Sequence, residues 1–255
     1  MTATVPARPQ TAAGTIQFWS DLLCPDAHVA IHRLTAARES LGLTDQVRLD
    51  HHAFPLELFN GPHSRPGTDS EAVSLGQIEP GAGFRLWTAA DWLYPNTVLL
   101  ANEAVYAAKA QGLRQAEDLD RGLRKAFWME SRTIGHRHVI LDVAEEVGTV
   151  NVTALTEALD SGRHRTEVMA DYAVAQTDAI NGSPHMFTPD GYGVNNPGIT
   201  VHWEGPWASG YPVVDKHDSE WVEDLLKRAV SRIPRLPRKP DGADGGRASA
   251  ATASS

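Results

Sequence analysis

An apolar run that stops at a cysteine and gives way to a helical pattern constrains this chain more than any other feature. The run Thr15–Leu23 has nearly continuous apolar positions, which is typical of a strand covered on both faces of its sheet. It ends at Cys24-Pro25, and beyond this point apolar residues recur at spacings near three until Gly42. Val47–Phe54 predicts a second strand. The β-α-β order predicts a right-handed parallel unit that delivers Cys24 to the start of its helix.

Helical patterns dominate the middle of the chain. Pro55–Gly83 is rich in Gly, Pro and Ser, and it predicts a long surface loop with little regular structure. We expect Asn96 to cap the first helix of the block. The predicted helices are Thr97–Ala110, Glu117–Glu130, His138–Glu146, Thr153–Asp160 and Thr166–Ile180. Two short strands, Met186–Thr188 and Ile199–Trp203, and an amphipathic helix over Ser219–Ile233 complete the order.

Charge and cysteine content exclude several classes of protein. A net charge of −9 argues against a nucleic-acid partner, because phosphate binding needs a basic face. One cysteine excludes an internal disulfide framework and suits a reducing compartment. The first residues show no signal-peptide pattern, and no stretch has the length of a membrane span. We therefore expect a cytoplasmic protein without a membrane partner, and its arginine-rich, alanine-rich composition suggests a bacterial origin.

Cys24 is the candidate for covalent chemistry. The thiolate is the reactive form of cysteine, and a helix N-terminus favours it through free N–H groups and the helix dipole. Pro25 suits the first helical turn. Asp26 would repel a thiolate, whereas a protonated His28 one turn away would compensate. An isolated cysteine is more often a buried, inert residue, but the strand–Cys-Pro–helix setting and a distant Pro184 loop favour a reactive one.

A set of dispersed motifs resembles a known family. The set comprises Phe18-Trp19-Ser20-Asp21-x-x-Cys24-Pro25, Phe54, Asn96-Thr97, Ala126-Phe127-Trp128-Met129-Glu130 and Gly182-Ser183-Pro184. In this order and spacing the set resembles the DsbA-like thioredoxin-fold family, in particular its FrnE and 2-hydroxychromene-2-carboxylate isomerase branch. The resemblance extends from about residue 15 to residue 232.

The resemblance implies an α/β fold: a thioredoxin-like core with an inserted helical domain. Residues 1–14 would form a disordered N-terminus, 15–60 and 169–233 the two halves of the core, 61–168 the insertion and 234–255 a disordered tail. It also implies a nucleophile at Cys24 and a cis peptide bond before Pro184, with the Ser183 backbone as a substrate-binding edge. Ala27 departs from the family, because dithiol members carry their second cysteine there. A single-cysteine variant cannot by itself carry out net dithiol oxidation.

The remaining candidate residues are polar or aromatic. Trp87, Trp92, Asn96 and Trp128 are candidates for a substrate cleft between insertion and core, although core packing explains each aromatic residue equally well. Tyr192 is a further candidate, and Asn195, Asn196 and Trp203 also follow the Pro184 loop. No metal site is expected, because Cys24 and the histidines of the first helix are too far apart along its axis for one ion.

Three functions remain open. In the first, Cys24 attacks a disulfide or an electrophile, and an external thiol such as glutathione or mycothiol resolves the adduct. In the second, the protein is a thiol-cofactor-dependent isomerase or transferase acting on an aromatic or polyketide-type molecule, and Cys24 positions the cofactor thiol. The third is a non-catalytic binding protein. No covalently bound cofactor is expected, and a homodimer is a further candidate assembly.

Overall fold

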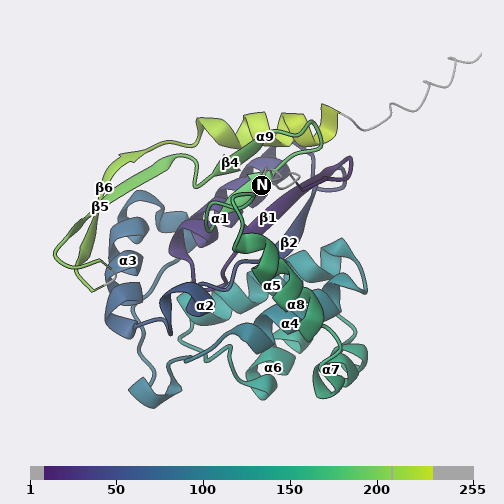
Figure 1. Ribbon diagram of the computed structural model, residues 1–255, viewed down its shortest axis with the longest axis horizontal. Coiled ribbons are helices and arrows are strands. Elements are labelled where there is room, and N and C mark those ends of the chain that lie inside the picture. Colours follow the sequence, from purple (N-terminus) through teal and green to yellow (C-terminus); the bar gives the residue numbers. More distant parts are fainter. Residues whose placement is uncertain (1–8, 208, 232–255) are drawn as a thin grey trace, which may run out of the picture.

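A four-stranded mixed sheet forms the centre of the molecule (Figure 1). The computed structural model describes residues 9–207 and 209–231. Strand β1 (Thr15–Ser20) pairs in parallel with β2 (Arg48–Ala53), and α1 (Pro25–Ser40) connects them. On its other side β1 pairs antiparallel with β3 (His185–Phe187), which pairs with β4 (Gly193–Asn195). The sheet order is β2-β1-β3-β4, and it contains the predicted β-α-β unit.

Alternation along β1 distributes its side chains between two cores. Ile16 and Phe18 are buried together with residues of α1 and of the C-terminal helix α9 (Glu220–Ser231). Trp19 points to the opposite face and packs with Phe54, Phe187 and residues that follow β2 and α8 (Arg165–Ala175). Successive strand residues face opposite sides of a sheet, so a strand buried on both faces needs a nearly continuous apolar sequence. The pattern of residues 15–23 is explained in this way.

A layer of helices lies beside the sheet, in the lower half of Figure 1. These helices are α4 (Leu99–Lys109), α5 (Leu113–Trp128), α6 (Arg137–Val147) and α7 (Val152–Ser161). They enclose the largest apolar cluster, which also includes Leu22 and Leu23 from the loop before Cys24. The helical block therefore packs directly against the segment that carries the cysteine.

The prediction that Pro55–Gly83 is a loop is wrong. This segment forms α2 (Glu57–Asn60), α3 (Arg65–Ile78) and the 3-10 turn η1 (Pro80–Ala82), and a second 3-10 turn, η2 (Asp91–Leu93), follows. The Ser64 hydroxyl accepts a hydrogen bond from the Gly67 N–H and thus caps α3. Packing of α3 against α1 and strand β6 stabilises a helix whose Gly and Ser content disfavours it locally.

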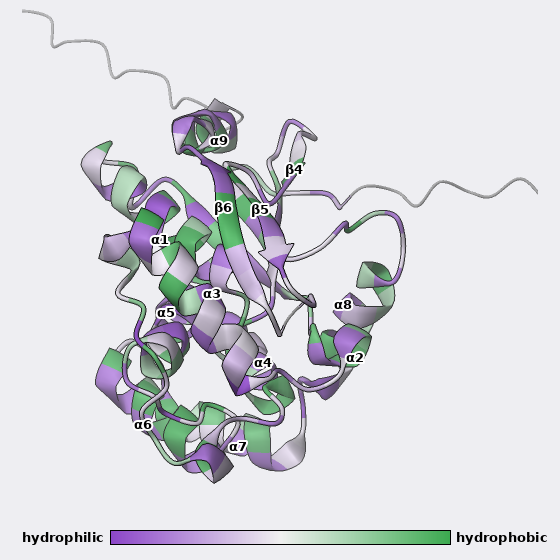
Figure 2. Ribbon diagram, turned by 90° about the vertical axis from the view of Figure 1, so that its left-hand side faces the viewer, coloured by the Kyte–Doolittle hydropathy of each residue, from purple (hydrophilic) through white to green (hydrophobic). Residues whose placement is uncertain are grey.

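Two further corrections concern caps and strands. Asn96 does not cap α4, because Val98 is its N-cap residue and the Glu57 carboxylate accepts a hydrogen bond from the Val98 N–H. The C-terminal part forms a hairpin of β5 (Ile199–Glu204) and β6 (Tyr211–His217), and the sequence pattern indicated only the first of these strands. Figure 2 shows this hairpin lying alongside α3. The predicted tail, 234–255, and residues 1–8 lie outside the described residues.

Candidate functional site

Cys24 is the N-cap residue of α1, and it follows the short loop that connects β1 to this helix. Its side chain is only 4% exposed, and its Sγ donates a hydrogen bond to the Ser183 carbonyl oxygen at 3.2 Å. The Ser183–Pro184 peptide bond is cis, as the resemblance implied. Ala27 is fully buried one helical turn beyond the cysteine. The sulfur therefore faces the Pro184 loop and has no second thiol beside it.

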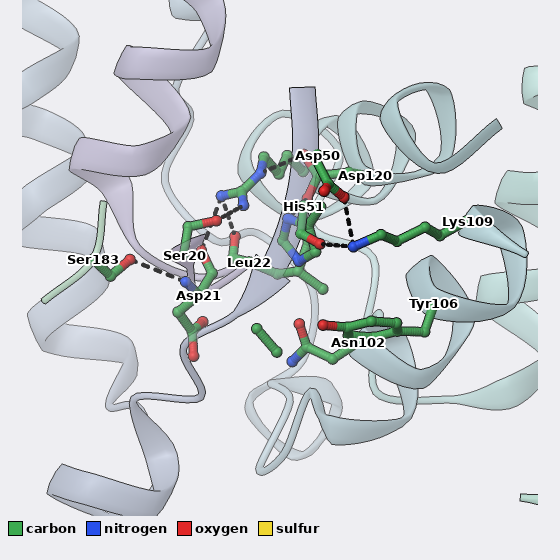
Figure 3. A network of polar contacts seen from close by, with 12 residues as sticks. Ser20, Asp21, Leu22, Asp50, His51, Asn102, Tyr106, Lys109, Asp120 and Ser183 are labelled. Carbon is green, nitrogen blue, oxygen red and sulfur yellow. Dashed lines mark hydrogen bonds and ion pairs between the residues drawn. The ribbon is translucent and has the colours of Figure 1, made fainter. Parts of the chain in front are cut away.

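Asp21 organises the loop between β1 and Cys24. One carboxylate oxygen accepts a hydrogen bond from the Leu23 N–H at 2.7 Å, and the other accepts one from the Leu56 N–H at 2.8 Å. His63 Nε2 lies 3.5 Å from the same carboxylate. The Asp21 N–H donates to the Ser183 hydroxyl at 2.9 Å, as Figure 3 shows. One buried residue thus connects the cysteine loop with both neighbouring loops.

The same loop is held from the helical side by α5. Arg124 is 1% exposed and donates hydrogen bonds to the Asp21 carbonyl oxygen and the Ser20 hydroxyl, at 3.0 and 2.8 Å. Its Nε donates to Asp120, which also lies 3.3 Å from His51. Figure 3 shows this network reaching from Ser183 across the loop to Asp120 and His51. The Trp128 ring N–H donates to the carbonyl oxygen of Leu22.

A cavity of about 310 Å³ opens beside the sulfur. Its wall comes from four parts of the chain: the start of α1, the segment from Leu56 through α3, Ser183, and the β5–β6 hairpin. The lining residues used below are Cys24, Asp26, His63, Glu71, Trp203 and Trp207. Cavities of this size hold small molecules. The hairpin and α3, which the sequence pattern largely missed, form much of this site.

Two carboxyl groups dominate the electrostatics of the cavity. Burial raises the pKa of Asp26 to about 6, and one of its oxygens is shielded from water without a hydrogen-bond partner. Burial, with repulsion from Asp26, raises the pKa of Glu71 to about 8. Burial likewise raises the pKa of the Cys24 thiol, and the Asp26 charge raises it further. The native environment therefore disfavours the Cys24 thiolate, despite the helix N-terminus.

His63 and His28 differ in their ability to offset these charges. Burial disfavours the charged form of His63, but its hydrogen bond and ion pair with Asp21 outweigh this and raise its pKa. The predicted compensation of Asp26 by His28 is wrong. Burial lowers the pKa of His28 to about 4, and its Nε2 donates to the Ala82 carbonyl oxygen at 2.8 Å. His28 is neutral at pH 7 and lines a different cavity, between α1 and α5.

Replacing Asp26 tests how much its buried charge lowers the free energy of unfolding. Because the pKa of Asp26 rises on folding, the native state loses stability as the pH increases from about 4 to about 6, and this loss is constant at higher pH. Asp26→Asn should therefore increase the free energy of unfolding at pH 8 by about 2 kcal/mol, with little gain near pH 4. It should also lower the pKa of Cys24 and speed its alkylation at pH 8. Denaturant unfolding and alkylation rates measure both effects.

The matched control for this experiment is Asp45→Asn, because the Asp45 side chain is fully exposed. It should change neither quantity measurably. Equal stability of Asp26→Asn and the native sequence at pH 8 would contradict the assigned cost of the buried charge.

The predicted aromatic cleft does not form around Cys24. Trp87 and Trp128 are 4% and 2% exposed, and they belong to the apolar cluster of the helical block. Trp92 is 84% exposed and lines another cavity with Asn96. Tyr192 faces outward, with the Arg228 guanidinium 4.3 Å from its ring centre. Rings within the helical block bury more apolar surface against one another than a cleft would allow.

Four residues after the Pro184 loop are candidates from the sequence. Trp203 lines the cavity, whereas Tyr192, Asn195 and Asn196 are not among its lining residues. His63, Glu71 and Trp207 are cavity residues that the sequence pattern did not predict. The local signals for α3, which carries Glu71, are the cap at Ser64 and Pro66 in the first turn. Among the residues that the structure describes, no group of three His, Cys, Asp or Glu side chains could hold a metal ion. None of the described helices is long and apolar enough to span a membrane.

Solved structures of DsbA-type proteins have a similar fold. A probable DsbA oxidoreductase from Streptomyces coelicolor is 19% identical, with a TM-score of 0.60 over 91% of this chain and 99% of that chain. The cytosolic disulfide reductase DsbM from Pseudomonas aeruginosa, solved with GSH, is 20% identical, with a TM-score of 0.54 over 71% of this chain and 89% of that chain. No curated protein sequence is significantly similar.

Sequence comparison with protein families gives the same result over most of the chain. Residues 15–200 match the DSBA-like thioredoxin domain, and this range includes Cys24, the cis-Pro184 loop and the whole helical block. Members of the family are oxidoreductases or isomerases. The chain belongs to the DSBA-like thioredoxin domain family, as a member with a single cysteine.

Proposed function

We propose that the protein is a single-thiol oxidoreductase in which Cys24 exchanges with a small-molecule disulfide. The observation that carries this proposal is the position of the sulfur: it is the N-cap of α1, it contacts the Ser183 carbonyl and it lines a cavity of small-molecule size. Pro25 shapes the helix start, and Ser183 and Pro184 form the edge along which a substrate lies. Asp26 sets the ionisation of the thiol.

The proposed reaction has two steps. The Cys24 thiolate attacks a disulfide RS–SR, a Cys24–S–S–R bond forms, and RS⁻ leaves and takes up a proton. An external thiol R′SH then attacks the mixed disulfide, gives RS–SR′ and returns Cys24 to its thiol form. The net reaction is RSSR + R′SH → RSH + RSSR′. A second thiol of the same chain takes no part, because Cys24 is the only cysteine.

The raised pKa of Cys24 affects both steps, because it lowers the fraction of attacking thiolate in the first and slows the departure of Cys24 in the second. A high-pKa thiol is a poor leaving group, so the mixed disulfide should be long-lived. Of the two external thiols expected from the sequence, mycothiol suits the acidic cavity better, since glutathione carries a net negative charge at neutral pH. We place the proposed reaction in the cytoplasm, where such thiols are abundant. The homodimer expected from the sequence stays a prediction.

Mass spectrometry of the intact protein tests the proposal. Incubation with 2-hydroxyethyl disulfide at pH 8 should add one half-disulfide to the protein, and a low-molecular-weight thiol should remove it. Cys24→Ala should show no adduct. A folded native protein that forms no adduct over hours, while the same chain does so in urea, would contradict thiol exchange and leave the cofactor-dependent isomerase or a non-catalytic binding role.

The second candidate is a thiol-cofactor-dependent isomerase or transferase. Its specific support is that Cys24 keeps its proton at neutral pH and acts as a hydrogen-bond donor. In that chemistry the Cys24 side chain would position the thiolate of a bound cofactor. Cys24→Ser then retains most of the activity, whereas single-thiol exchange is abolished by the same substitution.

A further inference from the structure

We propose that the Cys24 cavity selects small disulfides that carry a cationic amine close to the sulfur. This inference rests on the proposed function and names the class of its substrate. Its basis is an imbalance of charge around the cavity, together with an aromatic wall on the β5–β6 hairpin.

The imbalance begins with the two carboxyl groups. Asp26 and Glu71 both line the cavity; burial raises the pKa of both, and the Asp26 charge raises that of Glu71 further. One Asp26 oxygen is shielded from water and has no hydrogen-bond partner. A buried carboxylate needs a counter-charge or hydrogen bonds to be stable. Asp26 lines the cavity, so a cation that enters it would supply such a counter-charge.

Cations of the chain itself do not meet this need. Within the described part of the chain, no Lys or Arg lines the cavity. His63 lines it and lowers the pKa of Glu71, but its ring is paired with Asp21 at 3.5 Å, and it is not among the causes that shift the pKa of Asp26. Arg124, the nearest buried guanidinium to the cysteine loop, is engaged by Asp120 and by carbonyl oxygens of the loop. An ammonium group on the substrate would therefore be the counter-charge for the Asp26 carboxylate, and it would favour ionisation of Glu71, whose pKa of about 8 keeps it largely protonated at neutral pH.

The hairpin provides a second feature suited to a cation. Trp203 and Trp207 line the same cavity, with ring centres 6.4 Å apart. Faces of indole rings attract ammonium groups, and Trp gives the strongest such contact. A small amine can thus lie between carboxyl groups and indole rings while its sulfur is directed toward Cys24.

Binding of a cation also has a chemical consequence. The charge of Asp26 is one cause of the raised pKa of Cys24. A substrate ammonium beside Asp26 would offset that charge and increase the thiolate fraction during the encounter. A substrate without an amine would meet a smaller thiolate fraction, so its adduct would form more slowly.

Three disulfides of similar size test the inference: cystamine, which is cationic, 2-hydroxyethyl disulfide, which is neutral, and dithiodiglycolate, which is anionic. The readout is the cystamine-to-dithiodiglycolate ratio of adduct rates for the native protein, divided by the same ratio for the chain in urea. This double ratio cancels intrinsic reactivity and the thiol pKa of each variant. We expect a value of at least about 10, decreasing with added salt.

Variants assign the preference to the two carboxyl groups. Glu71→Gln and Asp26→Asn should each reduce the double ratio at least about threefold, whereas Glu145→Gln, on the exposed face of α6, should leave it unchanged. A double ratio near 1 for the native protein, with adducts forming from all three disulfides, would overturn the amine preference and leave thiol exchange intact.

A non-covalent measurement separates the two proposals. Cys24→Ala cannot form an adduct, so thermal stabilisation of this variant by cystamine reports binding alone. Stabilisation by cystamine but not by 2-hydroxyethyl disulfide supports the amine site even if thiol exchange fails. Equal effects of the two compounds would contradict it.

Discussion

Arg124→Met should lower the free energy of unfolding by about 3 to 5 kcal/mol, the usual cost of breaking a buried ion pair on one side. Arg124 is 1% exposed, and its guanidinium pairs with Asp120 while it donates to two groups of the cysteine loop. Met fills a similar volume but leaves Asp120 buried beside His51, which is neutral at pH 7 because burial lowers its pKa to about 4. Chemical denaturation at pH 7 measures the loss.

Two other substitutions calibrate this result. Arg124→Lys retains the charge but cannot supply the planar set of donors, so we expect an intermediate loss. Arg114→Met changes an arginine of the same helix whose side chain is 65% exposed and lies 3.7 Å from Asp118. Such exposed pairs contribute at most about 1 kcal/mol. A loss for Arg124→Met no larger than for Arg114→Met would contradict the role assigned to the buried network.

Arg124 should also affect the thiol. Because its side chain holds the Ser20–Leu22 segment, Arg124→Met should loosen the loop before Cys24. Alkylation of Cys24 in the folded protein should then become faster and approach the rate of the unfolded chain. This second measurement distinguishes a positioning residue of the loop from one that only stabilises the helical block.

Asp21→Asn should lower the free energy of unfolding by about 2 to 4 kcal/mol, because a buried N–H group loses its acceptor. The two Asp21 oxygens accept from Leu23 and Leu56, and an amide can offer only one oxygen to these donors. Denaturant unfolding at pH 7 is the measurement, with Asp178→Asn, at an exposed position, as control. Equal losses in the two variants would contradict the hydrogen-bond assignment.

The pH dependence of this variant gives an independent test. Burial would raise the pKa of Asp21, but its hydrogen bonds with His63, Leu23 and Leu56 outweigh this and lower it. The native protein should therefore lose stability as the pH falls through the folded-state pKa of Asp21, and Asp21→Asn should lack this acid-induced loss. The raised pKa of His63 should fall in the variant, since its anionic partner is removed. An NMR titration of His63 measures that shift.

Much of the core could be predicted from local pattern. The strand predicted for residues 15–23 was confirmed over Thr15–Ser20, and the helix that follows and the parallel second strand were also confirmed, because a buried strand and a helix impose different periods on their apolar residues. The cis bond before Pro184, expected from family resemblance, was also confirmed. These elements alone place Cys24 at a helix start opposite Ser183.

The rest of the site depended on contacts between distant segments. Segment 55–83 has the composition of a loop, yet α3 forms there because it packs against α1 and β6. Strand β6 in turn needs β5 as its partner, and together they carry the indole wall. Local propensities are small compared with such packing, so neither element could be identified from its own residues.

The amino-acid sequence by itself determined that this protein has one thiol, that a buried strand leads to it and that no second cysteine can resolve an adduct. Only the tertiary structure decided the environment of that thiol. Burial and the neighbouring Asp26 charge disfavour its ionised form, His28 is directed away to Ala82, and Glu71 reaches the cavity from another helix. Ionisation depends on the dielectric and on charges within a few ångströms, and those are properties of packing between segments remote in sequence.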